Sequence, residues 1–194
     1  MVLQRQKNAL LKRGKRDRSL WRVLTTQMRP ICEKIVQYRN EMTSELAPKI
    51  ENHYRSLTDS KEQIEFTYTQ ETEKRLQKKE EDLWEMEENT RNCELGPHRD
   101  DWSLLLENKA LRHFGSEGQQ KSACLAMRLS EIENTLGAKE RSGLILIDDV
   151  LVELDQKRSE RFWGQIPQSL QTIYATVATK NHYLPERFTQ KLTV

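Results

Sequence analysis

The sequence predicts a mixed α/β fold in which a helical arm precedes a part where strands and helices alternate. Apolar residues recur every three or four positions from Leu20 to Leu57, which is the period of a helix. Residues 143–148 and 172–179 are short apolar and β-branched runs, typical of neighbouring strands in a buried sheet. Charged residues make up 32% of the 194 residues, which favours long exposed helices with much surface and little core.

Two helices are expected at the N-terminal end. Residues 1–14 read as the end of a helix, because the last of them is a glycine that can stop it. Asp17 or Ser19 can cap the long helix that follows. Pro30 and Pro48 lie inside that helix, and each is expected to kink or break it because proline removes a backbone donor and crowds the preceding turn.

A short strand separates the long helix from a second helical stretch. Residues 63–69 alternate apolar and polar side chains, which predicts a half-buried strand. Residues 71–92 return to a helical pattern with heavy charge. The helical stretches can pack as an antiparallel, coiled-coil-like hairpin, so residues 1–94 are predicted to form an arm and residues 95–194 a second domain.

The second domain is expected to alternate strands with helices. Residues 143–148 are continuously apolar, which is typical of a strand buried on both faces. The predicted elements are a strand at 102–106, a turn at 108–109, a helix at 117–136, a strand at 143–148, a helix at 156–163 and a strand at 172–179.

The three cysteines and the N-terminal sequence indicate the compartment. Cys32, Cys93 and Cys124 are odd in number and widely spaced, so they fit neither a disulfide framework nor a CxxC metal site. The basic start of the chain lacks the apolar segment of a secretory signal. The sequence contains no run of about 18 apolar residues, so no membrane span is expected. A reducing, cytoplasmic setting without a membrane partner is expected.

Positive charge is concentrated at the start of the chain. Residues 1–40 carry a net charge of +9, whereas residues 71–100 carry −4. A basic block can contact the phosphates of DNA, and a solvated helix face explains the same charges equally well. The candidate DNA contacts are Arg13, Lys15, Arg16 and Arg18.

Two acidic residues directly follow the apolar run near position 145. Such a strand delivers carboxylates at its C-terminal end, where open α/β sheets place their ligands. In a Walker B arrangement, Asp148 is a metal residue that holds Mg²⁺, and Asp149 is the catalytic carboxylate that orients or deprotonates the attacking water. On this pattern alone, a buried strand running into an acidic turn is an equal alternative.

A serine and two glycines, Gly115, Ser116 and Gly118, lie at the start of the helix predicted at 117–136. Glycine lets the backbone approach a ligand closely, and a helix N-terminus offers free N–H groups to an anion. Taken alone, an ordinary helix cap by Ser116 is the favoured interpretation. The motif is followed by the apolar run with its two acids and then by Glu153-Leu154-Asp155, which is the order of the signature, Walker B and D-loop of ABC-type ATPases.

Three segments together carry a resemblance to a known family. GPHRDD at 96–101, FGSEGQQKSACLAMRLSEIE from Phe114 and LILIDDVLVELD from Leu144 closely resemble the RecF family of DNA replication and repair proteins, as does RQKNALLK near the start. The resemblance covers nearly the whole chain. It implies the C-terminal part of an ABC-type ATPase head with an inserted helical arm.

The resemblance also implies a function and partners. Members of this family are ATP- and Mg²⁺-dependent, DNA-binding homodimers that act at single-stranded gaps with RecO and RecR, in recombinational DNA repair, replication and the SOS response to DNA damage. The signature residues implied to contact ATP bound by the other subunit are Ser116, Gly118 and Gln119. Asp155 is implied as the D-loop acid.

The family motif at 96–101 receives no sharper role from the resemblance. Its candidate residues are Gly96, His98, Arg99 and Asp100. As structural alternatives, His98 can brace a turn, and Arg99 can pair with Asp100 or Asp101.

One part of the nucleotide site is missing from the sequence. No GxxxxGK[ST] phosphate-binding loop occurs anywhere in the chain. A fragment, a split gene or a truncated form of the family is therefore expected, with ATP hydrolysis only when the Walker A half completes it. The alternative is a non-catalytic DNA- or partner-binding module, or a degenerate remnant, that cannot bind ATP alone.

Overall fold

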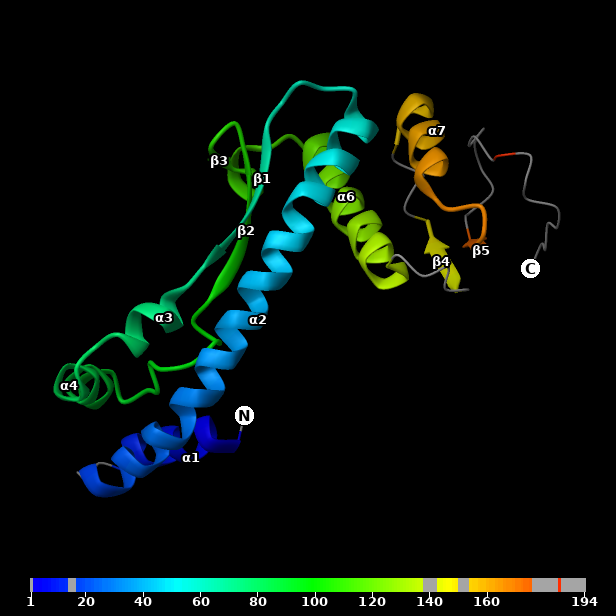
Figure 1. The fold of residues 1–194 in the computed structure, drawn as a ribbon. Coiled ribbons are helices and arrows are strands. Elements are labelled where there is room, and N and C mark those ends of the chain that lie inside the picture. The colour runs from blue at the N-terminus through cyan, green and yellow to red at the C-terminus, as the bar shows by residue number, and fades with distance from the viewer. Residues whose placement is uncertain (1, 14–16, 138–142, 150–153, 176–184, 186–194) are drawn as a thin grey trace. The chain divides into compact units, whose positions relative to one another are not determined.

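The computed structural model describes residues 2–13, 17–137, 143–149, 154–175 and 185 (Figure 1). The chain divides into two compact units. The first unit contains Met1–Glu45 and Phe66–Ser103, and the second contains Leu46–Glu65 and Leu104–Val194. The predicted division into an arm over 1–94 and a head over 95–194 stays a prediction.

Helices outnumber strands in the described part of the chain. The helices are α1 (Val2–Lys12), α2 (Arg18–Thr58), α3 (Glu71–Leu76), α4 (Glu80–Thr90), α5 (Leu111–Phe114), α6 (Glu117–Leu136) and α7 (Gln156–Gln165). The strands are β1 (Ile64–Thr69), β2 (Asp101–Leu106), β3 (Lys109–Ala110), β4 (Leu144–Asp148) and β5 (Gln171–Ala175). The order confirms a mixed α/β chain. None of the helices in the described ranges combines the length and apolar character needed to cross a membrane.

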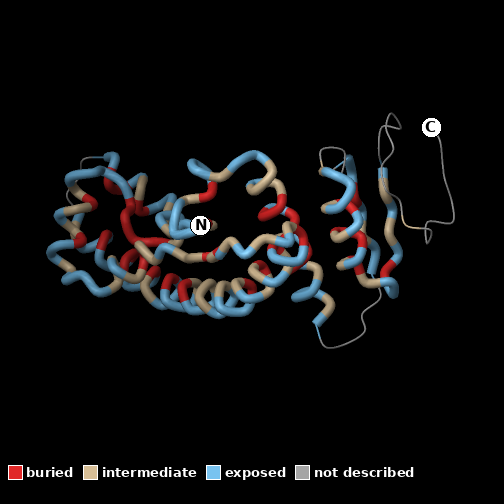
Figure 2. Tube along the Cα trace, turned by 90° about the horizontal axis from the view of Figure 1, so that it is seen from above, coloured by how far each residue is buried: buried red, intermediate tan, exposed pale blue. Residues whose placement is uncertain are grey.

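The long helix α2 begins at the predicted cap and runs through both prolines. The Asp17 carboxylate accepts a hydrogen bond of 2.9 Å from the Leu20 N–H, which satisfies one free donor at the helix start. The predicted breaks at Pro30 and Pro48 are wrong, because α2 remains one helix. Both prolines lie on its exposed side, where water can hydrate the carbonyls that lose their partners. Figure 2 shows buried positions recurring at intervals along this helix.

A helical core holds the first unit together. Its buried residues come from α1, α2, α4 and the segment after α4: Leu10, Leu11, Trp21, Leu24, Met28, Cys32, Leu83, Cys93 and Leu95. Burial of a side chain of this size stabilises a fold by roughly 1.5–3 kcal/mol, so this cluster fixes how the three helices pack.

The single helix predicted at 71–92 is two helices. A break at residues 77–79 separates α3 from α4. Arg29 on α2 donates hydrogen bonds to the carbonyl oxygens of Leu76, at 2.7 Å, and Lys78, at 3.5 Å. The guanidinium therefore replaces the helical partners of carbonyls at the end of α3, which lets the chain turn there.

Strands β1, β2 and β3 form one sheet in that order. The predicted strand at 63–69 is β1. Strands β2 and β3 pair antiparallel, with Leu106 opposite Lys109. Glu107 and Asn108 link them with positive φ angles of 49° and 62°, as the tight turns of two-residue hairpins require.

The second unit contains a parallel pair of strands. Strand β4 pairs with β5, with Ile147 opposite Tyr174. On one side Ile147 is buried, and the Tyr174 ring meets Trp163 of α7 edge-on at 5.4 Å. On the other side Leu144, Leu146 and Ile173 are 60%, 69% and 47% exposed. Burial of β4 on both faces, as predicted, is therefore wrong for the described residues, because only one face of the pair is covered.

Candidate functional site

The signature segment begins α6 with a capping box. Ser116 Oγ accepts from the backbone N–H of Gln119 at 3.3 Å, and Gln119 Oε1 accepts from the N–H of Ser116 at 2.8 Å. The helix-cap interpretation of Ser116 is confirmed. A serine that accepts as a cap still has its own O–H to donate, and Ser116 is exposed. The cap and contact with an anion are therefore compatible roles.

Gln119 also ties α6 to the segment between α2 and β1. Its side-chain amide donates to Glu62 Oε1 at 2.7 Å. The other oxygen of Glu62 accepts a hydrogen bond of 3.2 Å from the hydroxyl of the buried Tyr54. Burial, reinforced by the carboxylate of Glu62, raises the pKa of Tyr54 above its ordinary range, so the hydroxyl remains a donor at neutral pH. The start of α6 therefore rests on an ordered network.

Arg158 joins the signature to the predicted D-loop acid. Its Nη1 donates to the carbonyl oxygen of Gly118 at 3.3 Å, and its Nε lies 3.3 Å from Asp155 Oδ2. A Cβ placed on Gly118 would lie 2.9 Å from Arg158 Nη1, so the glycine leaves the space that the guanidinium occupies. Arg158 is not among the predicted site residues, although its position one turn after Asp155 on a predicted helix is the spacing of an ion pair.

Asp155 itself begins α7 as its N-cap. Its carboxylate accepts from the N–H of Arg158 at 3.0 Å. Ser116, Gly118, Asp155 and Arg158 therefore form one cluster at the starts of two helices, and helix starts attract anions. Glu153 of the predicted D-loop lies outside the described residues.

The two predicted Walker B acids lie at the C-terminal end of β4. Asp148 is the last residue of the strand and is exposed. Asp149 has a left-handed φ of 51°, and its N–H donates to the carbonyl oxygen of Ala175 at 2.9 Å. Aspartate is one of the few residues with a side chain that adopts this conformation readily. The backbone therefore turns sharply between the two carboxylates instead of continuing as an extended strand.

In the first unit, His98 braces the turn that begins the family motif. Its Nε2 lies 3.0 Å from the carbonyl oxygen of Cys93, so Nε2 carries the proton and donates. Gly96 has a φ of 144°, and a Cβ there would meet the His98 ring at 2.8 Å. The motif therefore requires a glycine at this position, both for the backbone conformation and for the imidazole.

Arg99 and Asp100 tie the motif to its surroundings. Arg99 Nη2 donates to Glu94 Oε1 at 2.6 Å, so the expected pairing with Asp100 or Asp101 is wrong. The fully buried Asp100 carboxylate accepts from the Tyr68 hydroxyl at 2.6 Å and from the Thr72 N–H at 2.7 Å. Burial, together with the hydrogen bond to Asp100, raises the pKa of Tyr68 to about 12.

Arg39 completes the surroundings of Asp100. Its guanidinium lies 4.7 Å from the ring centre of Trp102, which stacks on Tyr68 at 5.3 Å. It also donates to the carbonyl oxygen of Pro97 at 2.7 Å and lies 3.4 Å from Asp100 Oδ2. The second half of the motif is therefore occupied by contacts within its own unit.

The basic block is partly neutralised by the acidic segment at residues 71–100. Arg18 pairs with Glu81 at 3.0 Å, and Arg22 pairs with Glu80 at 2.7 Å. Arg13 is exposed and forms no ion pair within the described ranges. Lys15 and Arg16 lie outside those ranges.

The chain is similar in sequence to proteins of known family. No protein-family model matches it. Proteins named DNA replication and repair protein RecF are 32% identical over 186 residues in Exiguobacterium sp., 30% over 194 residues in Heliobacterium modesticaldum and 32% over 189 residues in Halothermothrix orenii. These alignments cover 89%, 94% and 87% of this chain but 50%, 52% and 49% of the relatives. The chain therefore spans about half the length of the curated relatives that it matches.

Solved structures give the same fold. Two structures of the recombination mediator protein RecF in the RecFOR pathway, RecF-ATPrS and RecF-ATP, superpose with TM-scores of 0.74 and 0.72 at 21% identity. The superpositions cover 92% and 94% of this chain, and they cover 51% and 52% of the two solved chains. In sequence and in fold, the chain matches the C-terminal half of the DNA replication and repair protein RecF.

Proposed function

We propose that this chain supplies the signature, Walker B and D-loop part of a RecF-like, DNA-binding ATPase of recombinational repair. The observation that carries the proposal is the cluster in which Arg158 joins Gly118 of the signature to Asp155 of the D-loop. In an ABC-type dimer the signature and the D-loop face the other subunit. A direct contact between them would let both segments respond when a nucleotide held by that subunit docks.

The start of α6 has the chemistry for a terminal phosphate. Within the part of the chain that the structure describes, no side chain accepts from the N–H groups of Glu117 and Gly118, which lie in the first turn where the helix cannot satisfy them. The Ser116 hydroxyl stands beside them as a further donor. We assign Ser116, Gly118 and Gln119 to the γ-phosphate of ATP held by a partner subunit.

The Walker B acids fit a metal ion that is shared with the nucleotide. No group of three or more His, Cys, Asp or Glu side chains in the described ranges can hold a metal alone. Magnesium is commonly bound by one or two carboxylates together with substrate phosphates and water, so an exposed Asp148 suits it. Bound Mg²⁺ would neutralise phosphate charge, while Asp149 would orient the attacking water.

An exposed apolar face on β4 and β5 supports completion by a second polypeptide segment. Leu144, Leu146 and Ile173 present an apolar surface on the outer side of the strand pair. Surfaces of this kind mark interaction sites in folded proteins. We propose that the Walker A half packs there, because this chain matches only about half the length of its relatives.

The partners follow from the same proposal. The completed protein would form an ATP-dependent homodimer on DNA that is single-stranded, gapped or double-stranded, and would act with RecO and RecR in the SOS response and in replication. The three cysteines are free, which is consistent with a reducing cytoplasm.

The proposal is tested by restoring the missing half. The chain is co-expressed with the half of the Exiguobacterium protein that it does not match, and mass is measured by light scattering with and without Mg-ATP. The expected result is a complex that dimerises and hydrolyses ATP only with both halves present. A complex that binds ATP but never dimerises would overturn the assignment of the signature.

A second candidate, a DNA-binding module that does not bind ATP alone, is favoured by one observation. The chain has no GxxxxGK[ST] loop, yet the exposed Arg13 forms no ion pair with any residue that the structure describes. Calorimetry of the isolated chain with Mg-ATP should then show no binding. Its DNA affinity should fall steeply with salt, and replacing Arg13, Lys15, Arg16 and Arg18 by alanine should lower both the affinity and the salt dependence. An affinity unchanged in that variant would remove the basic block from consideration.

A further inference from the structure

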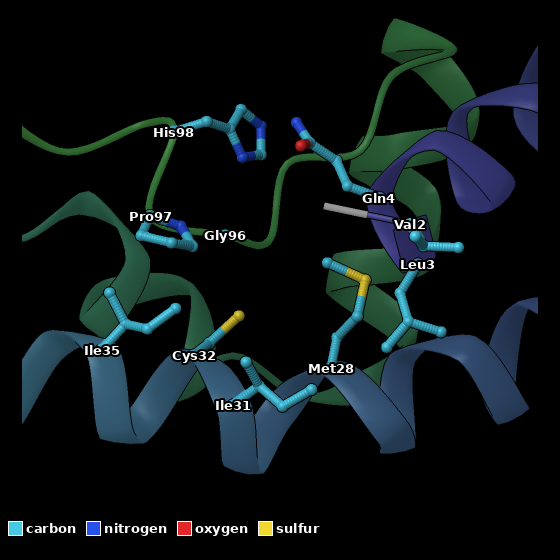
Figure 3. A pocket seen from close by; sticks show the side chains of 10 residues that line it. All are labelled: Val2, Leu3, Gln4, Met28, Ile31, Cys32, Ile35, Gly96, Pro97 and His98. Atoms are coloured by element: carbon cyan, nitrogen blue, oxygen red, sulfur yellow. The ribbon is translucent and has the colours of Figure 1, made fainter.

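The first unit contains a pocket that none of the roles above uses. It has a volume of about 320 Å³ and lies between α1, α2 and the start of the family motif. Met28, Ile31 and Ile35 rise into it from α2, and Pro97 and His98 form the opposite side (Figure 3). A cavity of about 150 Å³ is enough to bind benzene, so this pocket has room for a larger ring.

The walls of the pocket are fixed before anything binds. Met28 and Cys32 belong to the buried core of the unit, and Leu3 of α1 packs against the same core. Gly96 places the His98 ring, because any larger residue there would collide with it. A preformed site loses little entropy on binding, which favours affinity.

Cys32 serves as an apolar wall. Its side chain is 3% exposed, and burial raises the pKa of the thiol to about 11. The thiol therefore stays protonated at neutral pH, and the thiolate, which is the nucleophile and metal ligand, does not form. The pocket is suited to non-covalent apolar contact.

Two polar groups stand at the edge of this apolar space. Figure 3 shows the His98 ring and the Gln4 amide pointing toward one another across one side of the pocket. Because His98 Nε2 donates to the Cys93 carbonyl, Nδ1 of the neutral ring is an acceptor. A ring that carries an N–H or O–H matches this combination of apolar walls and an acceptor.

Apolar residues surround the mouth of the pocket, and basic residues lie next to them. Val2 and Ile31 line the pocket while 69% and 50% exposed. Arg5 and Lys34 follow them by one helical turn, are exposed, and form no ion pair in the part of the chain that the structure describes. Successive residues of a helix are rotated by roughly 100°, so Glu33 projects from α2 about 160° away from Ile31. The Glu33 carboxylate therefore does not offset the positive charges at the mouth of the pocket.

We propose that this pocket binds an aromatic side chain, tryptophan or tyrosine, on an acidic segment of a partner protein. The ring fills the apolar space beside the family motif, its N–H or O–H reaches His98 or Gln4, and flanking carboxylates meet Arg5 and Lys34. Buried aromatic anchors of this kind supply most of the affinity of small interfaces.

The probe is an acetylated, amidated peptide with a central tryptophan and two aspartates on each side. The whole chain carries isotope-labelled methionine and isoleucine methyl groups, and its NMR spectrum is followed during titration. The methyl signals of Met28, Ile31 and Ile35 should shift and saturate, while Met42, which is exposed on the same helix, should not. Replacing the tryptophan of the peptide by alanine should weaken binding about tenfold or more.

Matched variants separate the pocket from the rest of the helix. Ile31→Glu places a carboxylate at the mouth and should abolish saturable binding, while Val23→Glu changes an equally exposed apolar residue outside the pocket and should leave it intact. Ile31→Gln should give an intermediate loss. If the tryptophan and alanine peptides shift the same methyl groups equally, or if both glutamate variants behave alike, the proposal is wrong. If a peptide with lysines in place of the aspartates binds as tightly, the inference that the partner segment is acidic is wrong.

Discussion

Lys7 Nζ lies 2.8 Å from Glu87 Oε2, and both side chains are fully buried. The same carboxylate accepts hydrogen bonds from the indole N–H of Trp21 at 2.6 Å and from the backbone N–H groups of Glu94 and Leu95, at 2.8 and 3.1 Å. One side chain of α4 thus joins α1, α2 and the segment that leads into the family motif. The ammonium group also lies 4.9 Å from the ring centre of Trp21.

Loss of the Glu87 charge should therefore destabilise the first unit strongly. Glu87→Gln leaves the buried ammonium without a counter-charge, and breaking one partner of a buried pair costs about 3–5 kcal/mol. Urea unfolding, followed by circular dichroism, measures the change. Glu81→Gln is the control, because it removes an exposed partner of Arg18 worth no more than about 1 kcal/mol. Equal effects of the two substitutions would show that the buried pair does not hold the unit together.

Alkaline pH should weaken the contacts around the family motif. The pKa of Tyr68 is raised from 10.0 to about 12, chiefly by burial and then by its hydrogen bond to Asp100. The unfolded chain therefore loses this proton first as pH rises. The contribution of Tyr68 to the free energy of unfolding is complete below pH 10 and is lost as pH rises toward 12.

The measurement is urea unfolding at a series of pH values in this window. Tyr68→Phe should flatten the part of the decline that this residue causes, because its ring remains while the titrating hydroxyl is gone. Asp100→Asn should lower the pKa of Tyr68 toward its ordinary value by removing the carboxylate. An unchanged slope in Tyr68→Phe would assign the pH dependence to other groups.

The two roles of Ser116 can be separated by substitution. Ser116→Asp retains an N-cap of equal quality, so the stability of α6 should be kept, whereas Ser116→Ala should cost about 1 kcal/mol. In the completed ATPase, the added carboxylate of Ser116→Asp would repel the γ-phosphate of the other subunit. ATP-driven dimerisation should then fail in a protein that still folds and binds ATP. If Ser116→Asp dimerises normally, Ser116 is only a helix cap.

Much of the fold could be predicted from local sequence pattern, and the failures have physical causes. The apolar series of α2 correctly predicted a helix, but Leu20, Ile31 and Tyr38 in that series are 45%, 50% and 68% exposed. Periodicity reports which residues share a side of a helix and does not report whether another element covers that side. The break after α3 was missed because it depends on Arg29, which is far away in sequence.

The candidate site shows the same division between local and long-range information. The capping role of Ser116 follows from a short segment, so the sequence was sufficient to predict it. Arg158 and Glu62 were missed because their contacts with Gly118 and Gln119 join residues separated by 40 and 57 positions. Nothing in a single sequence marks such pairs, whereas spacing of three or four residues does.

The role of Asp149 is the sharpest test of whether the completed protein is an enzyme. Asp149 follows β4 in a left-handed conformation, which asparagine adopts as readily as aspartate. Asp149→Asn therefore removes the charge and keeps the backbone conformation, whereas Asp149→Ala adds backbone strain. With the Walker A half restored, Asp149→Asn should keep ATP binding and ATP-driven dimerisation. Its hydrolysis rate should fall by about 10²-fold or more, the usual effect of losing a general base. Single-turnover measurements separate this step from nucleotide release, and a normal rate in Asp149→Asn would assign the catalytic carboxylate to another residue.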